Sequence, residues 1–162
     1  MQLITDNYIK EFCSAVSKAQ RYIYINSYTI SPPIPSLGLR FASAWEAVFA
    51  AVKRGVEVRV LVDGGSESKL LMSGIVRFFS FEMPPGIKIR LLGIGKKLHA
   101  KFYIIDDSVF CVGSHNFTKR GLSNPYELSL LCYNNDVAVR LKTYYLSMWG
   151  VSYDYKNSKR AS

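Results

Sequence analysis

The chain has 162 residues, of which 49% are hydrophobic and 20% are charged, which predicts one folded domain and excludes a disordered or fibrous protein. Lysine and arginine number 21 against 12 aspartate and glutamate residues, so the formal net charge is +9. The last ten residues hold three basic residues and one acid, a share of +2, and the remaining +7 on the folded body favours a polyanionic partner, either nucleic acid or an anionic membrane surface.

The first half of the chain alternates between helix-like and strand-like segments. Helices are predicted where apolar residues recur at helical spacing, and strands where β-branched and aromatic residues run together. The predicted helices cover residues 5–20, with Thr5 as the cap, 39–53 and 67–81, and the predicted strands cover residues 21–30, 56–63 and 87–92. This alternation predicts βαβαβ organisation with a largely parallel sheet.

The second half has a different pattern, because three strand candidates follow one another closely. They cover residues 98–105, 109–113 and 126–133, and a last helix is predicted at 134–149 with Val137, Leu141, Tyr144 and Met148 facing inward. We therefore expect an α/β fold: a mixed β-sheet flanked by helices on both faces, in a single domain over residues 1–152. Residues 153–162 are expected to be a basic, disordered tail.

The three cysteines, Cys13, Cys111 and Cys132, lie far apart and form no CxxC pair. An odd, sparse set argues against a disulfide framework and against a structural zinc site. The N-terminus has polar residues where a signal peptide needs its apolar stretch, and no segment approaches the ~18 to 20 apolar residues of a membrane span. A cytoplasmic protein is expected.

The stretch LHAKFYIIDDSVFCVGSHNF carries the chemistry. Side chains alternate along a strand, so His99 and Lys101 face the same way. Asp106 lies about 23 Å from His99 along an extended strand, so it belongs at the hairpin turn and not at a shared ligand. The connection DDS predicts that hairpin, with a two-residue loop that starts at either Asp106 or Asp107 and places Ser114 opposite His99 or Lys101.

Either register gathers an imidazole, an ammonium, a hydroxyl and an amide in one patch, with Gly113 allowing close backbone approach. The imidazole supplies a nucleophile or an acid/base group, and the other three donate hydrogen bonds to anionic oxygen. The groups come from His99, Lys101, Ser114 and Asn116. They predict a phosphate site with a nucleophile built into it.

The pattern His99-x-Lys101-x4-Asp106-x6-Gly113-Ser114-x-Asn116 resembles the HKD motif of the phospholipase D superfamily without a departure in residue or spacing. The resemblance implies a phospholipase D-like fold and a two-step, metal-independent phosphodiester cleavage through a phosphohistidine, with no cofactor. It also implies catalytic roles for His99, Lys101, Ser114 and Asn116, and motif positions of a structural kind for Asp106 and Gly113. Glu127, downstream of Asn124, resembles the acid that partners the catalytic histidine.

The chain holds one such motif, whereas the implied chemistry needs two histidines. His115 occupies the variable position of the motif and is expected to point elsewhere. The resemblance to small single-motif members of the superfamily implies a homodimer that brings two copies of His99 to one phosphate.

Two basic pairs flank the motif: Lys96-Lys97 before it and Lys119-Arg120 after it. They are expected to track phosphates of a long polyanion, and Tyr28 with the loop after it is expected to form a substrate wall. The favoured function is an endonuclease acting on DNA or RNA. One alternative is a phospholipase or cardiolipin-type lipid phosphodiesterase, which would need an exposed apolar rim that the sequence does not clearly indicate. The other is a non-catalytic nucleic-acid-binding module.

Overall fold

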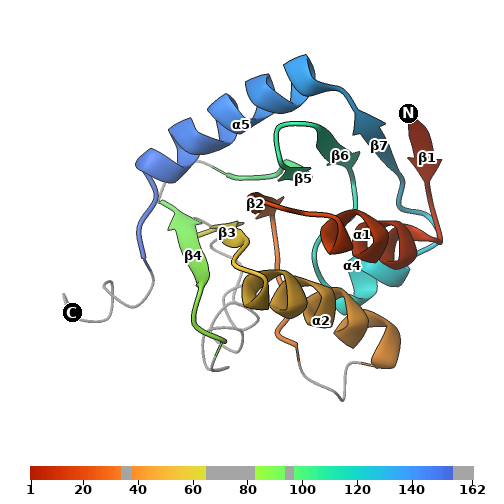
Figure 1. Cartoon of the computed structure of the whole chain (residues 1–162). Coiled ribbons are helices and arrows are strands. Elements are labelled where there is room, and N and C mark those ends of the chain that lie inside the picture. Colours follow the sequence, from red (N-terminus) through yellow and green to blue (C-terminus); the bar gives the residue numbers. More distant parts are fainter. Residues whose placement is uncertain (34–37, 65–82, 94–96, 155–162) are drawn as a thin grey trace.

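A computed structural model describes residues 1–33, 38–64, 83–93 and 97–154. In these ranges the strands form one seven-stranded sheet in the order β1-β7-β6-β5-β2-β3-β4 (Figure 1). The strands are β1 (Gln2–Ile4), β2 (Tyr22–Ser27), β3 (Glu57–Asp63), β4 (Ile87–Leu92), β5 (Lys101–Ile105), β6 (Val109–Gly113) and β7 (Ser129–Tyr133). Strands β2, β3 and β4 are parallel, and every other pairing is antiparallel, which confirms the predicted mixed sheet with a parallel first half.

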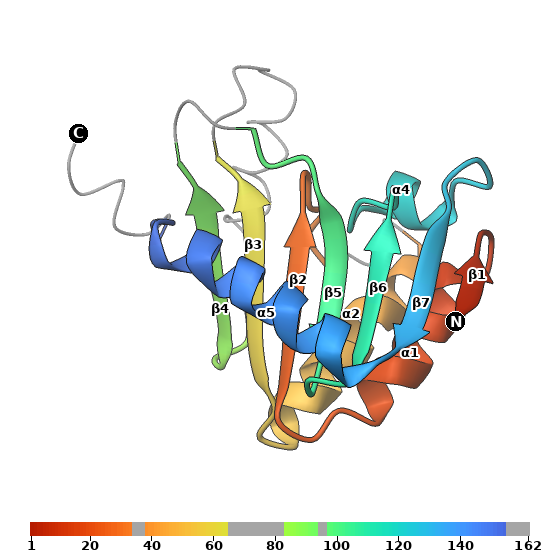
Figure 2. The same cartoon turned by 90° about the horizontal axis from the view of Figure 1, so that it is seen from above.

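Helices cover both faces of this sheet (Figure 2). On one face lie α1 (Tyr8–Ser17), α2 (Leu39–Lys53) and the short α4 (Lys119–Ser123), and on the other lies α5 (Asn135–Gly150). The core on the first face is built around Phe12, Trp45 and Tyr103, all at most 1% exposed. The core under α5 is aromatic, since Tyr145 stacks on Tyr24 with ring centres 5.0 Å apart. The predicted α/β class with helices on both faces is confirmed.

The N-terminal prediction was wrong at its start. Residues Gln2–Ile4 are a strand that pairs antiparallel with β7, with Gln2 opposite Leu131, and α1 begins only after Asn7. The helical periodicity therefore does not extend back to Thr5. The physical reason is long-range: three residues gain backbone partners at a sheet edge that is formed more than a hundred positions later in the chain.

The inward face of the last helix was predicted correctly at Leu141 and Met148 and wrongly at Val137 and Tyr144. Tyr145 and Trp149 are buried, one helical turn apart, whereas Val137 is 43% and Tyr144 52% exposed. The aromatic pair decides the rotation of α5, because it stacks with ring centres 5.8 Å apart and Trp149 receives the guanidinium of Arg59 on its face. The helix predicted at 67–81 lies outside the described residues.

The β5–β6 hairpin has a three-residue connection, so neither predicted two-residue loop was correct. Lys101 lies opposite Gly113 and Ile105 opposite Val109. Asp106 and Asp107 both adopt the left-handed conformation, with φ of 54° and 60°. The Asp106 carboxylate accepts the backbone N–H groups of residues 20, 21 and 22 at 2.6, 2.8 and 2.9 Å. Those three bonds fix the turn against the start of β2 and make the longer loop favourable.

The end of the described chain folds back onto the sheet. Tyr153 pairs with Leu91 through two backbone hydrogen bonds of 2.9 and 3.0 Å. Residues 155–162, most of the segment expected to be a tail, lie outside the described residues. Over the ranges that the structure covers, no helix combines the length and the apolar character needed to cross a membrane.

Candidate active site

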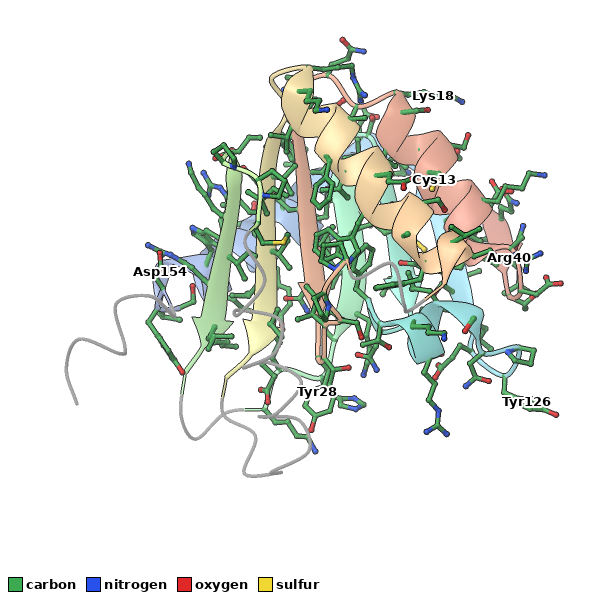
Figure 3. All side chains as sticks on the ribbon, turned by 90° about the horizontal axis from the view of Figure 1, so that it is seen from below. Cys13, Lys18, Tyr28, Arg40, Tyr126 and Asp154 are labelled. Carbon is green, nitrogen blue, oxygen red and sulfur yellow. The ribbon has the colours of Figure 1, made fainter. Side chains whose placement is uncertain are left out.

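The candidate site lies where the central strands β2 and β6 end and β5 begins; we call this row of strand ends the site edge of the sheet. Tyr28, which follows β2, marks this edge in Figure 3. His99 is exposed just before β5, whereas Lys101, the first residue of β5, is 7% exposed. Gly113 pairs with Lys101, so Ser114 and Asn116 follow at the same edge. The sheet therefore brings the two ends of the motif together, even though both predicted registers differ from the observed one.

Lys101 and His99 are in direct contact. The ammonium Nζ lies 3.1 Å from His99 Nδ1 and donates to the His99 carbonyl at 2.5 Å. An ammonium has donors only, so a charged Lys101 requires Nδ1 to accept and leaves the hydrogen of a neutral ring on Nε2. The Lys101 charge is the largest cause that lowers the pKa of His99, followed by burial and Lys97, and Asp63 acts in the opposite direction. The imidazole is therefore held neutral over a wider pH range.

The pKa of Lys101 is itself lowered, chiefly by burial, and the charge of Glu127 opposes this shift. Tyr28 packs over the same groups. Its ring centre lies 5.0 Å from that of His99, and the ammonium groups of Lys97 and Lys101 lie 5.2 and 5.5 Å from the Tyr28 ring centre. Cation–π contacts of this kind hold the two cations beside the imidazole without neutralising them.

Asn116 lies beside a polar cavity of about 320 Å³. The backbone N–H of Thr29 donates to Asn116 Oδ1 at 3.3 Å. Within the described chain Asn116 Nδ2 has no hydrogen-bond acceptor, so its hydrogens can donate to a ligand. The cavity is lined by Thr29, Asn116, Thr118, Arg120, Gly121, Asn124 and Glu127. An amide donor, a guanidinium and a carboxylate thus share one polar hollow, and its carboxylate, Glu127, acts on the charge of Lys101.

Gly113 and Ser114 hold the start of β7 against this edge. A Cβ on Gly113 would lie 2.1 Å from Ser129 Oγ and 2.3 Å from the Leu128 carbonyl, so only glycine fits there. Ser114 donates its backbone N–H to the Leu128 carbonyl at 2.9 Å, and its hydroxyl accepts the Leu128 N–H at 3.1 Å. Within the described chain, the Ser114 hydroxyl thus forms hydrogen bonds with the segment that carries Glu127 and not with His99.

Two residues of the motif region lie away from the site. Asp106 is at the opposite end of β5, where it fixes the hairpin, as the strand length requires. His115 is 3% exposed and lies between Ser129 Oγ at 2.8 Å and the Thr5 carbonyl at 3.1 Å. Burial lowers the pKa of His115. This histidine links the motif to the segment after β1, in agreement with the expectation that it points away from substrate.

The remaining predicted site residues lie at the rim. Lys97, Lys119 and Arg120 are exposed, and Arg120 reaches the polar cavity. Lys96 lies outside the described residues. Glu127 lines the cavity, but in the part of the chain that the structure describes no hydrogen bond joins it to His99. The same described ranges contain no group of three or more histidine, cysteine, aspartate and glutamate side chains placed to hold a metal ion.

The sequence reasoning missed two buried polar residues beside His99. Asn26 is 2% exposed and donates to the Ala100 carbonyl, and Asp63 is 1% exposed and accepts the Leu98 N–H, both at 2.8 Å. The available signal was a polar residue at the carboxyl end of an otherwise apolar or aromatic parallel strand, since ligand sites gather at such ends.

Comparisons with known proteins identify the family of this chain. A family model described as "Cardiolipin synthase, PLD-like domain" matches residues 12–149. Cardiolipin synthase A of Pseudomonas putida (strain W619) is 28% identical over 136 residues, which is 82% of this chain but 26% of that protein. The cardiolipin synthase of Clostridium perfringens is 27% identical over 137 residues, and the chain again spans about a quarter of its relative, 26%.

Two solved structures share the fold over nearly their whole length. NucT from Helicobacter pylori superimposes with a TM-score of 0.72 at 21% identity, covering 95% of this chain and 98% of that one. Nuc from Salmonella typhimurium, a phospholipase D family member, superimposes with a TM-score of 0.73 at 23% identity, covering 95% and 96%. The fold and the family model define a protein of the phospholipase D-like class. The family model covers most of the chain, which therefore belongs to the phospholipase D-like family typified by the cardiolipin synthase domain.

Proposed function

We propose that this chain is a nuclease that cleaves the phosphodiester backbone of DNA or RNA without a metal ion. The observation that carries the proposal is the exposed imidazole of His99 in contact with the Lys101 ammonium, beside an Asn116 amide whose Nδ2 is free to donate. Nucleic acid is favoured as the substrate because the net charge is +9 and exposed cations line the rim of the site.

The proposed reaction has two steps. His99 Nε2 attacks phosphorus, the bond to the leaving oxygen breaks, and a phosphohistidine forms while a second imidazolium gives its proton to the leaving oxygen. That second imidazole then takes a proton from water, which attacks phosphorus and releases His99. Lys101 and Asn116 donate to the non-bridging oxygens, where negative charge builds in the transition state.

The Lys101–Nδ1 contact sets a requirement on this reaction. With Nδ1 accepting, the hydrogen of the neutral ring is on Nε2, which is then no nucleophile. A bound phosphate offers anionic oxygens to the ammonium, so we expect substrate to draw Lys101 off Nδ1. The ring hydrogen is then free to move to Nδ1, with Glu127 as its proposed acceptor. Glu127 already acts on the charge of Lys101 within one chain, so this contact is proposed to form within the same chain once Lys101 has moved.

The second imidazole is proposed to come from a second copy of the chain. An apolar row, formed by Leu3, Leu130 and Val112, supports this proposal. The three side chains lie side by side on paired strands β1, β7 and β6, and they are 61%, 36% and 42% exposed. The row lies on the α5 side of the sheet, because Val112 pairs with Phe102, which packs on Tyr145 of α5.

Helix α5 crosses the sheet obliquely (Figure 2). The row remains exposed, and Val112 directly precedes Gly113, which pairs with Lys101 of the site. Exposed apolar rows of this kind mark interaction surfaces. The test is Val112→Lys, which should give monomers by sedimentation and lose cleavage. The matched control is Val139→Lys. Val139 is 43% exposed and lies on α5. It is about 140° round the helix axis from Tyr144, whose ring lies beside Phe102, so Val139 is on the flank of α5 that faces away from the row. A Val112→Lys protein that stays dimeric and active would remove the row from the interface.

A lipid phosphodiester is the second candidate substrate, because the family model is described by cardiolipin synthase and the two relatives above are cardiolipin synthases. The described surface adds an observation in its favour. Tyr126 and Leu128, on either side of Glu127, are 93% and 54% exposed, so the site has apolar side chains at its rim. Tyr126 projects from the same edge of the sheet as Tyr28 in Figure 3.

One experiment separates these proposals. Purified protein is incubated in the presence of EDTA with each substrate in parallel: labelled single-stranded DNA, double-stranded DNA, RNA and cardiolipin-containing vesicles. The His99→Ala variant is the inactive control. Nucleic-acid cleavage that survives EDTA and is lost in His99→Ala supports the proposal. Cleavage restored only by a divalent metal would contradict the histidine mechanism, and lipid turnover alone would favour the second candidate.

The basic rim has its own test. Lys119→Ala and Arg120→Ala should weaken nucleic-acid binding and lower the slope of log affinity against log salt by about one per lost phosphate contact. The matched controls, Lys18→Ala and Arg140→Ala, remove the same charge from exposed positions on α1's end and α5. Equal slopes in all four variants would mean that the rim cations do not contact phosphate.

A further inference from the structure

Two polar side chains are buried at the carboxyl ends of neighbouring parallel strands. Asn26 is the fifth residue of β2 and Asp63 the last of β3, and they are 2% and 1% exposed. Both lie on the α5 side of the sheet, since Asn26 pairs with Phe102 and Asp63 lies two residues after Leu61, which belong to the core on that side. Apolar residues would suit these positions better if packing alone decided them.

The two side chains hold the backbone on either side of His99. Asp63 Oδ1 accepts the N–H of Leu98 at 2.8 Å, and Asn26 Nδ2 donates to the carbonyl of Ala100 at 2.8 Å. The ladder between β2 and β5 ends at the pair Asn26–Phe102, so the residues around His99 run beyond the regular sheet. Their described hydrogen bonds to β2 and β3 therefore come from these two side chains and not from strand pairing.

Burying these two polar side chains lowers the stability of the fold. Asn26 Oδ1 and Asp63 Oδ2 are both buried and have no hydrogen-bond partner in the described chain. An unpaired buried polar atom lowers the free energy of unfolding, and a carboxylate more than an amide. The same two side chains fix the position of residues 98–100 and leave the His99 side chain exposed at the end of the strands.

We infer that Asn26 and Asp63 are positioning residues that clamp the backbone around His99 and so fix the direction from which its imidazole meets the phosphate. The inference rests on the proposed role of His99 as nucleophile. Neither residue belongs to the motif, and both act through the backbone and not on substrate. Misplacing a reacting group by about 1 Å can cost 10²-fold in rate, so the clamp has a measurable effect.

Asp63 also adds a charge to the surroundings of His99. Among the described residues, Lys97, Lys101 and the Tyr28 ring face this imidazole, and Asp63 is the carboxylate that acts on its pKa. It raises the pKa of His99, against the lowering by the two lysines. Removing that charge should therefore lower the His99 pKa further, which a change in packing alone would not do.

The test uses Asn26→Ala, Asp63→Ala and the conservative Asp63→Asn. Asn26→Ala and Asp63→Ala should each lower kcat about 10- to 100-fold with KM within about threefold. Asp63→Asn keeps an acceptor for the Leu98 N–H and should recover most of the lost kcat, while the His99 pKa, followed by NMR titration of its ring, should fall below the wild-type value. The matched control is Leu61→Val, a buried change between the two residues on the same face.

Leu61→Val should lower the melting temperature without changing kcat below it or the His99 titration. The clamp is overturned if Asn26→Ala and Asp63→Ala reduce kcat no more than Leu61→Val does at equal loss of stability. It is also overturned if the His99 pKa is the same in Asp63→Asn and wild type. If wild type cleaves no phosphodiester while Asp63→Asn still shifts the His99 pKa and Asn26→Ala changes its ring signals, the clamp stands and the proposed function fails.

Discussion

Mixing wild-type and His99→Ala chains tests whether one active site is built from two copies. The described chain offers one exposed imidazole, because His115 is 3% exposed and both its ring nitrogens have partners. A mixed dimer would therefore hold a single usable imidazole. It would lack either the nucleophile or the acid, and the loss of one general acid costs about 10² to 10⁴ in rate.

The expected magnitude follows from random pairing. If a fraction w of the chains is wild type, wild-type dimers form a fraction w² of all dimers, and mixed dimers add about 1% of full activity or less. At equal mixing the total activity should be about a quarter of the wild-type value, and at one wild-type chain in ten about a hundredth. Independent subunits would instead give a half and a tenth, so the dilute mixture separates the two models about tenfold.

The assay co-refolds chains at fixed total concentration and follows cleavage of a labelled oligonucleotide against w. Exchange is checked with a size tag on one chain. Dilution with Lys18→Ala, an exposed change far from the site, should leave activity unchanged. Activity that falls in proportion to w, with exchange demonstrated, would refute the composite site.

Three further outcomes follow from single contacts. Asp106→Ala removes the acceptor of three backbone N–H groups and should lower the free energy of unfolding by about 2–4 kcal/mol in urea denaturation; a loss under about 1 kcal/mol would contradict its role in the hairpin. Burial lowers the pKa of His115 in the native state, so stability should decrease as pH falls through the unfolded value of about 6.5, and His115→Gln in a His99→Ala background should flatten this dependence; an unchanged slope between pH 7 and 5 would exclude His115 as its source. Lys101→Met should raise the His99 pKa in NMR titration, since the ammonium is the main cause of its lowering; no rise would mean that the two groups do not interact in solution.

Local patterns predicted several elements to the residue. The observed α2, β4 and β6 span residues 39–53, 87–92 and 109–113, the ranges that periodicity and the neighbouring glycine and proline residues predict. In each case the deciding information lies within the segment itself. The motif likewise predicted that His99, Lys101 and Asn116 meet at one edge, since a hairpin returns its second strand beside its first.

What the sequence did not predict depends on contacts between distant segments. The three residues of β1 carry no strand signal of their own, and they are held by pairing with β7. The rotation of α5 about its axis depends on which tyrosine of the helix, Tyr144 or Tyr145, stacks on Tyr24, and the structure has Tyr145 there. Asn26 and Asp63 read as ordinary strand ends until the sheet places both against the segment around His99.

The substrate class is a harder problem, because the motif is proposed to bind phosphate oxygens, which DNA, RNA and phospholipids share. Discrimination must therefore come from the surface around the site, which combines exposed cations at Lys97, Lys119 and Arg120 with exposed apolar side chains. These are the row of Leu3, Leu130 and Val112 and the rim residues Tyr126 and Leu128. If two copies pair through the row, its side chains are buried and the cations remain beside the two rim residues to meet substrate, which favours nucleic acid. If the chain stays monomeric, the row remains open beside the site, which favours a lipid surface and leaves the single imidazole without its partner. Oligomeric state and substrate class are thus linked, and the behaviour of Val112→Lys bears on both.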